Sequence, residues 1–353
     1  MKKTTKIIII LLISIIPMFH IPTNKQVFAS SSSSEIVMEV NSKRVLYEKN
    51  AQEKKYMAST TKILTAIIII ENCDLSKIVT VSSKTVGIEG SSIYLKAGER
   101  ITVKDLLYGL MLRSGNDCAE TLAVHCSGSI KDFANLMNEK AKEIGAINSN
   151  FVNPHGLHDD NHYTTAYDLA LISCYAIKNP TFKEIVSTKS TKITFLESNY
   201  VRHIANKNKM LKEFDGATGI KTGFTKKAGR CLVSSCERDG LEIVSVVLNC
   251  PPMFEESKNI LNNAFSSFKL YKLFESDNII DFIIEEVSNR EVGIYVKNDI
   301  ILPLLEEEFK NIEINYNYSK KVNFLLKNDQ EIGTIEIYCK NNLLFVEKIY
   351  TIL

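Results

Sequence analysis

The residues of this sequence that are best suited to chemistry lie in three short motifs. They are Ser59-Thr60-Thr61-Lys62, Ser114-Gly115-Asn116 and Lys221-Thr222-Gly223. Each motif is weak alone, because the spacing of the first, a serine followed three residues later by a lysine, recurs at Ser266 to Lys269. Their surroundings strengthen the signal: the first opens an apolar segment, the second falls between two helical patterns, and the third leads into a strand-like run.

The first motif pairs a nucleophile with a base. Positions i and i+3 share one face of a helix, so the Lys62 amine can lie beside the Ser59 hydroxyl. A serine hydroxyl is a poor nucleophile until a base takes its proton. The apolar neighbours of Lys62 should disfavour its charged form and so provide a neutral amine. The positive end of the helix dipole would lie near the oxyanion that forms during acyl transfer.

The second and third motifs supply the other groups that acyl transfer requires. Ser114 offers a hydroxyl that can relay a proton, and the Asn116 amide can hold both the lysine and a substrate carbonyl. Lys221 and Thr222 present a cation and a hydroxyl on a strand edge, which suits a terminal carboxylate, while Gly223 lets a substrate backbone lie close. Together the motifs predict a serine acyl-transferase site in which no histidine acts as the base.

Hydrophobic periodicity predicts the elements that must hold these motifs. Residues 59–70 are apolar on every side after the first turn, which is typical of a helix that runs through a core. Further helices are expected at residues 103–112, 119–126, 130–144, 165–177 and 255–271. A hairpin is expected at 36–40 and 44–47, and buried strands at 231–235 and 242–249. Helices bracketed by strands indicate an α/β or α+β domain whose sheet joins its two ends.

The 353 residues are enough for about two domains. After Phe274 the pattern changes to alternating stretches, such as 292–296 and 333–338, with Asn-rich turns. This alternation predicts a small all-β domain at the C-terminus. The expected organisation is a signal peptide at 1–29, a serine-rich linker at 30–34, a catalytic domain at 35–272 and a C-terminal β domain at 276–353.

The N-terminus is typical of a secreted protein. Lys2, Lys3 and Lys6 precede an apolar run at residues 7–16, which Pro17 follows, and small or apolar residues at 27–29 suit cleavage after Ala29. The alternative is a transmembrane anchor, but a span needs about 20 apolar residues and this run is much shorter. We therefore expect an exported protein that acts outside the cytoplasm.

The charge excludes one class of partner. The whole chain has 43 basic and 41 acidic residues, a net charge of +2, so we expect no nucleic-acid binding. The first 29 residues hold four lysines and no acidic residue, so cleavage leaves 39 basic against 41 acidic residues, a net charge of −2.

The eight cysteines form no Cys-x-x-Cys pair, which argues against a zinc ribbon or a thioredoxin-like site. A chain of this length can bury a core without covalent links, so buried thiols are favoured over a disulfide framework, although export would permit disulfides.

The three motifs resemble those of the penicillin-binding protein and serine β-lactamase superfamily. The flanking sequence is similar to one branch, the D-alanyl-D-alanine carboxypeptidases, over about residues 35–270. The matching stretches are 58–62, 90–95, 114–117, 153–157, 164–169 and 219–225. This resemblance implies an antiparallel sheet flanked by helices, with an all-helical lobe, a site between them and a C-terminal β domain.

The resemblance also implies roles for individual residues. Ser59 would be the acylated nucleophile and Lys62 its proton acceptor, with Ser114 and Asn116 as the second catalytic element. Lys221, Thr222 and Gly223 would bind the substrate carboxylate and backbone, and the N–H groups of Ser59 and Phe224 would form the oxyanion hole. The implied reaction releases D-Ala from peptidoglycan stem peptides that end in D-Ala-D-Ala. This substrate implies that the exported protein acts at the cell wall or at the outer face of the cytoplasmic membrane. It requires no cofactor and no metal, and β-lactams would trap Ser59.

Three alternatives remain open from the sequence. His155, His158 and His162 could suggest a zinc peptidase, but their spacing is not His-Glu-x-x-His and Gly156 disfavours a helix there. A β-lactamase shares the three motifs, yet the chain has no Glu-x-x-Leu-Asn pentad between Asn116 and Lys221. The third alternative is a catalytically silent protein that binds the cell wall.

The family often ends in an amphipathic helix that binds the membrane surface. Here the last segment, residues 343–353, is equally compatible with a strand, and Lys348 is its only cation. We therefore do not expect this segment to attach the protein to a membrane.

Overall fold

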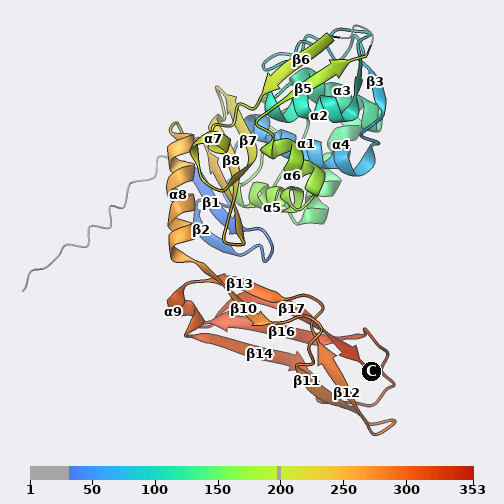
Figure 1. Ribbon diagram of the computed structural model, residues 1–353, viewed down its shortest axis with the longest axis vertical. Coiled ribbons are helices and arrows are strands. Elements are labelled where there is room, and N and C mark those ends of the chain that lie inside the picture. Colours follow the sequence, from blue (N-terminus) through green and yellow to red (C-terminus); the bar gives the residue numbers. More distant parts are fainter. Residues whose placement is uncertain (1–31, 197–199) are drawn as a thin grey trace, which may run out of the picture. The chain divides into compact units, whose positions relative to one another are not determined.

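A computed structural model describes residues 32–196 and 200–353 (Figure 1). The predicted signal peptide lies outside the described residues. The first part of the described chain is built on an antiparallel sheet of five strands. Their order is β2 (Val45–Lys49), β1 (Ser34–Glu39), β9 (Leu241–Leu248), β8 (Gly229–Arg238) and β7 (Ala217–Thr225). Because β1 pairs with β9, the two ends of the catalytic domain meet in one sheet, as the sequence predicts.

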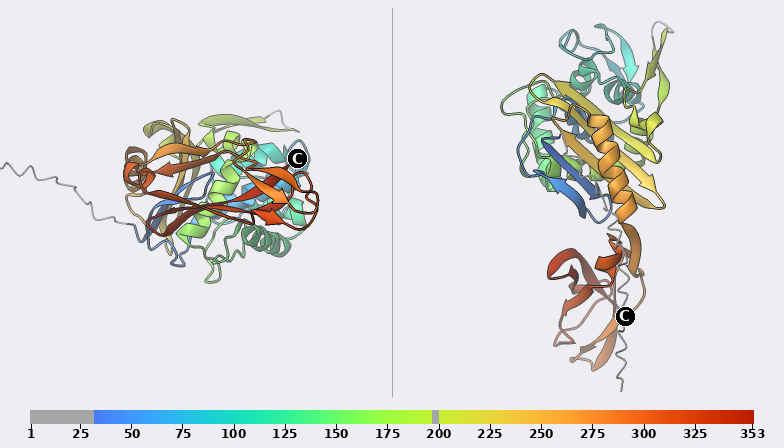
Figure 2. Two further views of the ribbon diagram at one scale, coloured as in Figure 1. Left: turned by 90° about the horizontal axis from the view of Figure 1, so that it is seen from below. Right: turned by 90° about the vertical axis from the view of Figure 1, so that its left-hand side faces the viewer.

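Strand β1 separates two layers of core. Ile36 and Met38 point to one side, where they join a cluster to which the helices α1 (Lys62–Asn72), α5 (Ala166–Ile177) and α6 (Pro180–Ser187) contribute. Val37 points to the other side and packs in a cluster with residues of helix α8 (Met253–Ser267). This alternation is what a strand buried on both faces requires. Figure 2 shows α8 lying across its face of the sheet.

Helix α1 (Lys62–Asn72) is the centre of the helical region. Its residues from Lys62 to Ile69 are buried, as expected for a helix that is apolar all round. The helices packed around it are α2 (Val103–Leu112), α3 (Asn116–Ser127), α4 (Ile130–Ile144), α5 (Ala166–Ile177) and α6 (Pro180–Ser187). Four of these helices are predicted by the sequence to within three residues at either end; α6 is not.

The structure adds short elements that the sequence pattern does not predict. These are β3 (Ile78–Thr80), β4 (Arg100–Thr102), β5 (Ser190–Phe195), β6 (Tyr200–Ala205) and α7 (Met210–Glu213). Helix α6 is also additional, although its start carries a recognisable signal. The Asn179 side chain accepts from the N–H groups of Thr181 and Phe182, and Pro180 occupies the first helical position.

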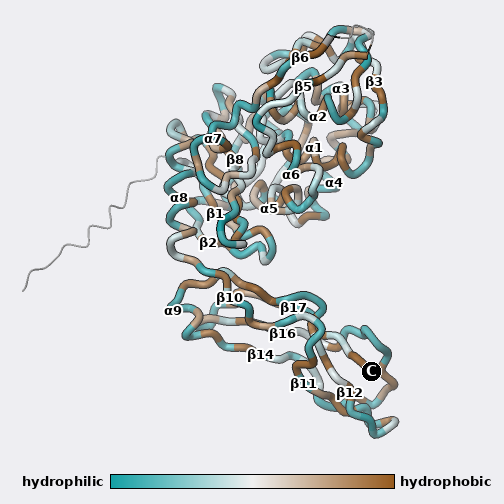
Figure 3. The backbone as a smooth tube through the Cα atoms, in the orientation of Figure 1, coloured by the Kyte–Doolittle hydropathy of each residue, from teal (hydrophilic) through white to brown (hydrophobic). Residues whose placement is uncertain are grey.

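The C-terminal part is all-β, as predicted, apart from the single turn α9 (Glu306–Phe309). One sheet has the order β14 (Ile312–Tyr318), β16 (Glu331–Cys339), β17 (Asn342–Ile352), β12 (Arg290–Tyr295), β11 (Asp281–Glu285) and β15 (Lys321–Val322). A second pairs β10 (Lys269–Phe274) with β13 (Ile300–Leu304). Hydrophobic and hydrophilic residues alternate along strands such as β16 (Figure 3).

Two predicted boundaries differ from the structure. The helix expected to reach residue 271 ends at Ser267, because Tyr271, Leu273 and Phe274 instead pack against the C-terminal core from strand β10. The last residues of the expected serine-rich linker, Ser32 to Ser34, also belong to the folded domain. The side-chain hydroxyls of Ser32 and Ser33 donate to the Leu248 carbonyl, and Ser34 begins β1.

The remaining sequence features concern membranes and cysteines. Among the described residues, no helix has the length and hydrophobicity needed to cross a bilayer. The last segment is the strand β17 rather than a helix. Six of the eight cysteines are buried, which agrees with their predicted role as small apolar residues. Cys126 on α3 lies against Cys73, which follows α1.

Candidate active site

Ser59 lies in a short 3₁₀ turn, η1 (Ala58–Thr61), that leads directly into α1. The hydroxyls of Thr60 and Thr61 donate to the carbonyls of Met57 and Ala58, at 2.7 and 2.9 Å. These local bonds tighten the turn, so α1 begins at Lys62. The sequence pattern predicts a helix that starts three residues earlier, at Ser59. The side chains of Ser59 and Lys62 still meet, since their spacing of three residues suits a 3₁₀ turn.

The Lys62 amine is fully buried and is surrounded by three oxygen atoms. Its Nζ lies 3.2 Å from Ser59 Oγ, 2.7 Å from Asn116 Oδ1 and 2.8 Å from the His155 carbonyl oxygen. Burial, and next the charge of Lys221, lower the pKa of Lys62 well below its ordinary value of 10.5. A neutral amine has two N–H groups and one lone pair. The two carbonyl oxygens can only accept, so in the neutral form the lone pair would face the Ser59 hydroxyl.

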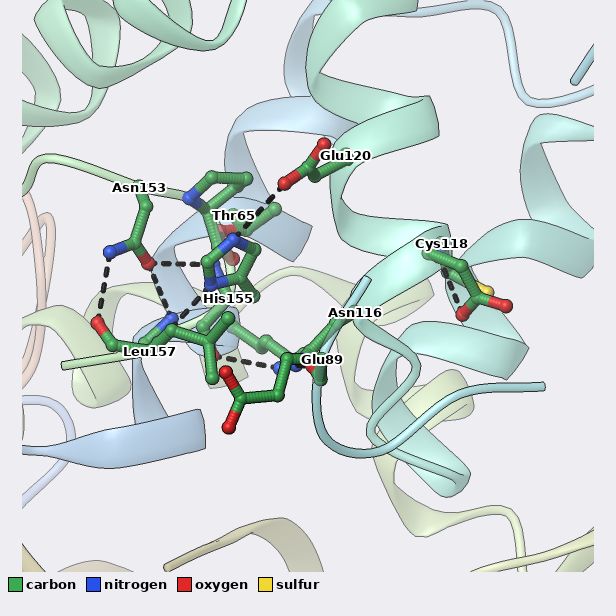
Figure 4. A network of polar contacts seen from close by, with 12 residues as sticks. Thr65, Glu89, Asn116, Cys118, Glu120, Asn153, His155 and Leu157 are labelled. Atoms are coloured by element: carbon green, nitrogen blue, oxygen red, sulfur yellow. Dashed lines mark hydrogen bonds and ion pairs between the residues drawn. The ribbon is translucent and has the colours of Figure 1, made fainter. Parts of the chain in front are cut away.

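Asn116 is the first residue of α3 and is held on both sides. Its amide Nδ2 donates to the Glu89 carbonyl at 2.5 Å (Figure 4). This bond orients Oδ1 toward Lys62. Gly90 is required here, because a Cβ at that position would lie 2.9 Å from Asn116 Nδ2. Ser114 is buried and takes a left-handed conformation, φ 65°, in the break between α2 and α3. In the part of the chain that is described, Ser114 is not a hydrogen-bond partner of Lys62.

The loop around Asn116 is fixed by a buried carboxylate. Asp117 accepts a hydrogen bond from the Ser92 hydroxyl at 2.6 Å and from the N–H groups of Ile93 and Leu95 at 3.2 and 3.0 Å. This anchors residues 91–95 to the start of α3. Tyr94 projects from the anchored loop and is 80% exposed.

Strand β7 brings the third motif to the same place. It is the edge strand of the sheet, and it approaches η1 closely at Gly223, where a Cβ would lie 3.0 Å from the Met57 carbonyl oxygen and 3.1 Å from Ser59 N. Burial, and next the charge of Lys207, lower the pKa of Lys221 to about 7. The side chain of Phe224 is exposed, with the Arg230 guanidinium 5.5 Å from its ring centre.

The loop at residues 153–157 supplies the third partner of Lys62, the His155 carbonyl. The three motifs alone do not predict this contact. Asn153 Oδ1 accepts from the N–H of Gly156 at 2.7 Å, and Thr65 Oγ1 donates to the Pro154 carbonyl at 2.7 Å. Gly156 has a left-handed φ of +86°, and a Cβ there would lie 1.9 Å from the Ala58 carbonyl oxygen. The glycine therefore allows the His155 carbonyl to reach Lys62. The sequence indicates this contact only through the stretch 153–157, Asn-Pro-His-Gly-Leu, which is one of those that resemble the carboxypeptidases.

The histidines do not form a metal site. His155 Nε2 lies 3.3 Å from Glu120 Oε1, and its Nδ1 accepts from the Leu157 N–H (Figure 4). His162 Nδ1 accepts from the Val152 N–H at 3.1 Å, so its Nε2 donates to Thr61 Oγ1 at 2.8 Å. No group of three or more His, Cys, Asp or Glu side chains in the described residues is arranged to hold a metal ion.

Comparisons with known proteins show which family the chain resembles. Residues 21–251 match the family described as D-alanyl-D-alanine carboxypeptidase, and residues 268–352 match the C-terminal domain of penicillin-binding protein 5. D-alanyl-D-alanine carboxypeptidase DacF of Bacillus subtilis is 30% identical over 325 residues, which cover 87% of this chain and 81% of DacF. DacC of Escherichia coli is 31% identical over 322 residues, which cover 85% and 78%.

Solved structures of this family have a similar fold. Penicillin-binding protein 5 of Haemophilus influenzae matches with a TM-score of 0.81 at 26% identity, over 92% of this chain and 97% of that one. A DD-transpeptidase mutant of Streptomyces K15 matches with a TM-score of 0.65 at 30% identity, over 67% and 98%. The predicted fold, a helix-flanked sheet with a C-terminal β domain, is confirmed. The family acts outside the cytoplasm.

The predicted class of enzyme is confirmed as well, and the family assignment argues against the β-lactamase alternative. The chain belongs to the D-alanyl-D-alanine carboxypeptidase family, whose members are serine peptidases.

Proposed function

We propose that Ser59 is the nucleophile of a carboxypeptidase that removes the terminal D-Ala from peptidoglycan stem peptides. The observation that carries this proposal is the environment of the Lys62 amine, whose Nζ lies within hydrogen-bond distance of two carbonyl oxygens and 3.2 Å from Ser59 Oγ. When the amine is neutral, the two carbonyl oxygens accept from its N–H groups and its lone pair is left for the Ser59 proton. The burial that lowers the pKa of Lys62 makes the neutral base available.

Acylation begins when the Ser59 proton passes to Lys62 Nζ and Oγ attacks the scissile carbonyl carbon. The N–H groups of Ser59 and Phe224 stabilise the oxyanion, which suits the close approach of β7 to η1 at Gly223. When the tetrahedral intermediate collapses, the C–N bond breaks. The proton returns from Lys62 to the amine of the departing D-Ala. The Ser114 hydroxyl would relay this proton only with substrate bound, because it makes no hydrogen bond to Lys62 within the described residues. Water then hydrolyses the acyl-enzyme by the same steps in reverse order.

The terminal carboxylate of the substrate is recognised by Lys221 and Thr222. Lys221 is buried, so its charge acts in a medium of low dielectric, and the carboxylate would stabilise the protonated amine. A β-lactam presents a comparable carboxylate and a strained amide, and would acylate Ser59 in place of the peptide. The chain has no Glu-x-x-Leu-Asn pentad, which carries the deacylating Glu of class A β-lactamases, between Asn116 and Lys221, so this adduct should be long-lived.

Release of D-Ala from a synthetic stem peptide tests the proposal. Ser59→Ala and Lys62→Met should each abolish release, because one removes the nucleophile and the other the base. The matched control is Ser266→Ala, which alters the second Ser-x-x-Lys sequence on α8 and should retain wild-type release. Unchanged release by Ser59→Ala, with Ser266→Ala inactive, would overturn the assignment. Wild-type protein that releases no D-Ala would favour the silent wall-binding alternative.

A further inference from the structure

A pocket of about 440 Å³ lies on the catalytic domain beside the site and has no role in the chemistry described above. Its walls include Lys54, Lys55, Tyr56, Asp160, Tyr163 and Lys227. A combination of aromatic rings with several cations is suited to an organic ligand that carries negative charge.

The position of the pocket follows from contacts along β7. Tyr56 lies three residues before Ser59, and the Tyr56 carbonyl oxygen is 3.9 Å from Cys231 Sγ. Residue Cys231, on β8, is the strand partner of Gly223 on β7. Ala228, another wall residue, donates its N–H to Thr225 Oγ1 at 3.0 Å. The pocket therefore lies where β7 turns into β8, just beyond the segment that faces Ser59.

The expected orientation of the substrate places the residues that precede the scissile bond toward this pocket. If the terminal carboxylate binds at Lys221 and Thr222 and the scissile carbonyl lies near Phe224, the preceding residues run on along β7 toward Thr225 and Lys227. An extended peptide can pair with β7 because this strand is at the edge of the sheet. Each extended residue covers about 3.3 Å, so the pocket lies within reach of a side chain about two or three residues before the scissile bond.

The charges of the pocket indicate what that side chain is. Lys54 Nζ lies 4.5 Å from the centre of the Tyr163 ring, and Lys55 pairs with Glu53 at 2.7 Å, outside the wall. Asp160 is the acidic residue of the wall, and it accepts a hydrogen bond from the Tyr56 hydroxyl at 3.1 Å. Lys227 is exposed and forms no ion pair with any of the described residues. Because Glu53 neutralises Lys55, the two other lysines stand against the single carboxylate of Asp160 and leave an excess of positive charge.

We propose that this pocket binds a carboxylate-bearing residue of the stem peptide, about two or three positions before the scissile bond, and that Lys227 is its main charged partner. This inference rests on the proposed function. It makes the pocket a determinant of specificity, so the enzyme would distinguish stem peptides that carry a free carboxylate at that position from peptides in which it is amidated.

Two synthetic peptides test the inference. They end in D-Ala-D-Ala and differ only in whether the residue two or three positions before the scissile bond carries a carboxylate or a carboxamide. Wild-type enzyme should show the higher kcat/KM for the acidic peptide. In Lys227→Gln the ratio of kcat/KM for the acidic to the amidated peptide should fall about fivefold, and further in a double variant with Lys54→Gln.

Lys226→Gln is the matched control, because Lys226 is the exposed neighbour of Lys227 but is not part of the pocket wall. It should keep the wild-type ratio. Penicillin acylation of each variant checks that the catalytic site is intact. A ratio near one in the wild type, or an equal loss for both peptides in Lys227→Gln, would overturn the inference. If the wild type released D-Ala from neither peptide, the proposed function itself would have failed.

Discussion

The substitution Gly156→Ala tests how far catalysis depends on the contact between the 153–157 loop and η1. A Cβ at Gly156 would lie 1.9 Å from the Ala58 carbonyl oxygen and 2.4 Å from the Ala58 carbonyl carbon. Both are backbone atoms, so no rotamer change relieves the clash. Restoring an ordinary contact of about 3.4 Å requires the loop and η1 to move apart by about 1.5 Å.

This movement would displace either the His155 carbonyl from Lys62 or Ser59 from Lys62. A misplacement of about 1 Å in a catalytic constellation can cost about 100-fold in rate. We therefore expect Gly156→Ala to lower the second-order rate constant of penicillin acylation by about 100-fold or more. The left-handed φ of +86° adds a strain of about 1 kcal/mol to the alanine variant, which lowers its thermal stability by about 2–4 °C.

Gly128→Ala separates the strain from the displacement. Gly128 also has a left-handed φ, +82°, but a Cβ added there would have no atom within 4 Å, and the residue caps α3 at the end opposite to Asn116. We expect this variant to lose similar stability from the strain and to acylate at the wild-type rate. Stopped-flow acylation with a fluorescent penicillin, with thermal unfolding of both variants, gives the comparison. Wild-type acylation by Gly156→Ala would refute the reasoning.

Three further predictions concern pH. The rate of penicillin acylation should rise as pH passes through the lowered pKa of Lys62, because only the neutral amine accepts a proton. A rate that begins to rise only near pH 10.5, the ordinary pKa of lysine, would contradict this. The KM for a stem peptide should increase above pH 7 as Lys221 loses its proton, and Lys207→Gln should move that increase to higher pH, since it removes a charge that lowers the pKa; an unmoved profile would exclude this coupling. Burial, and next His155, lower the pKa of His162 from 6.5 to about 3, so the unfolded chain binds the proton more readily. The melting temperature should therefore fall as pH drops from 6.5 toward 3, and His162→Gln should make this fall smaller. An equal fall in both proteins would show that groups other than His162 cause it.

The catalytic motifs can be predicted from the sequence because their geometry is mostly local. Ser59 and Lys62 are three residues apart on one turn, and the approach of β7 depends on Gly223, which the motif itself contains. Helices with strong periodicity, such as α2 and α4, are also predicted to the residue.

The contacts that complete the site cannot be predicted in this way. The His155 carbonyl is 93 positions from Lys62 in sequence, and only the packing of the loop onto η1 brings it near. Lys207 affects Lys221 for the same reason. Helix periodicity also fails at residues 269–271, because Leu270 and Tyr271 are compatible with a helix or a strand and the pairing of β10 with β13 decides between them.

The assignment of Ser59 as the nucleophile can be measured directly by mapping the penicillin adduct. The purified protein is incubated with a fluorescent penicillin, digested and analysed by mass spectrometry. One equivalent of adduct on the peptide that contains Ser59, and none in Ser59→Ala, is the predicted result. An adduct on Ser114 or Ser266 in place of Ser59, or a wild-type protein that forms no adduct, would contradict it.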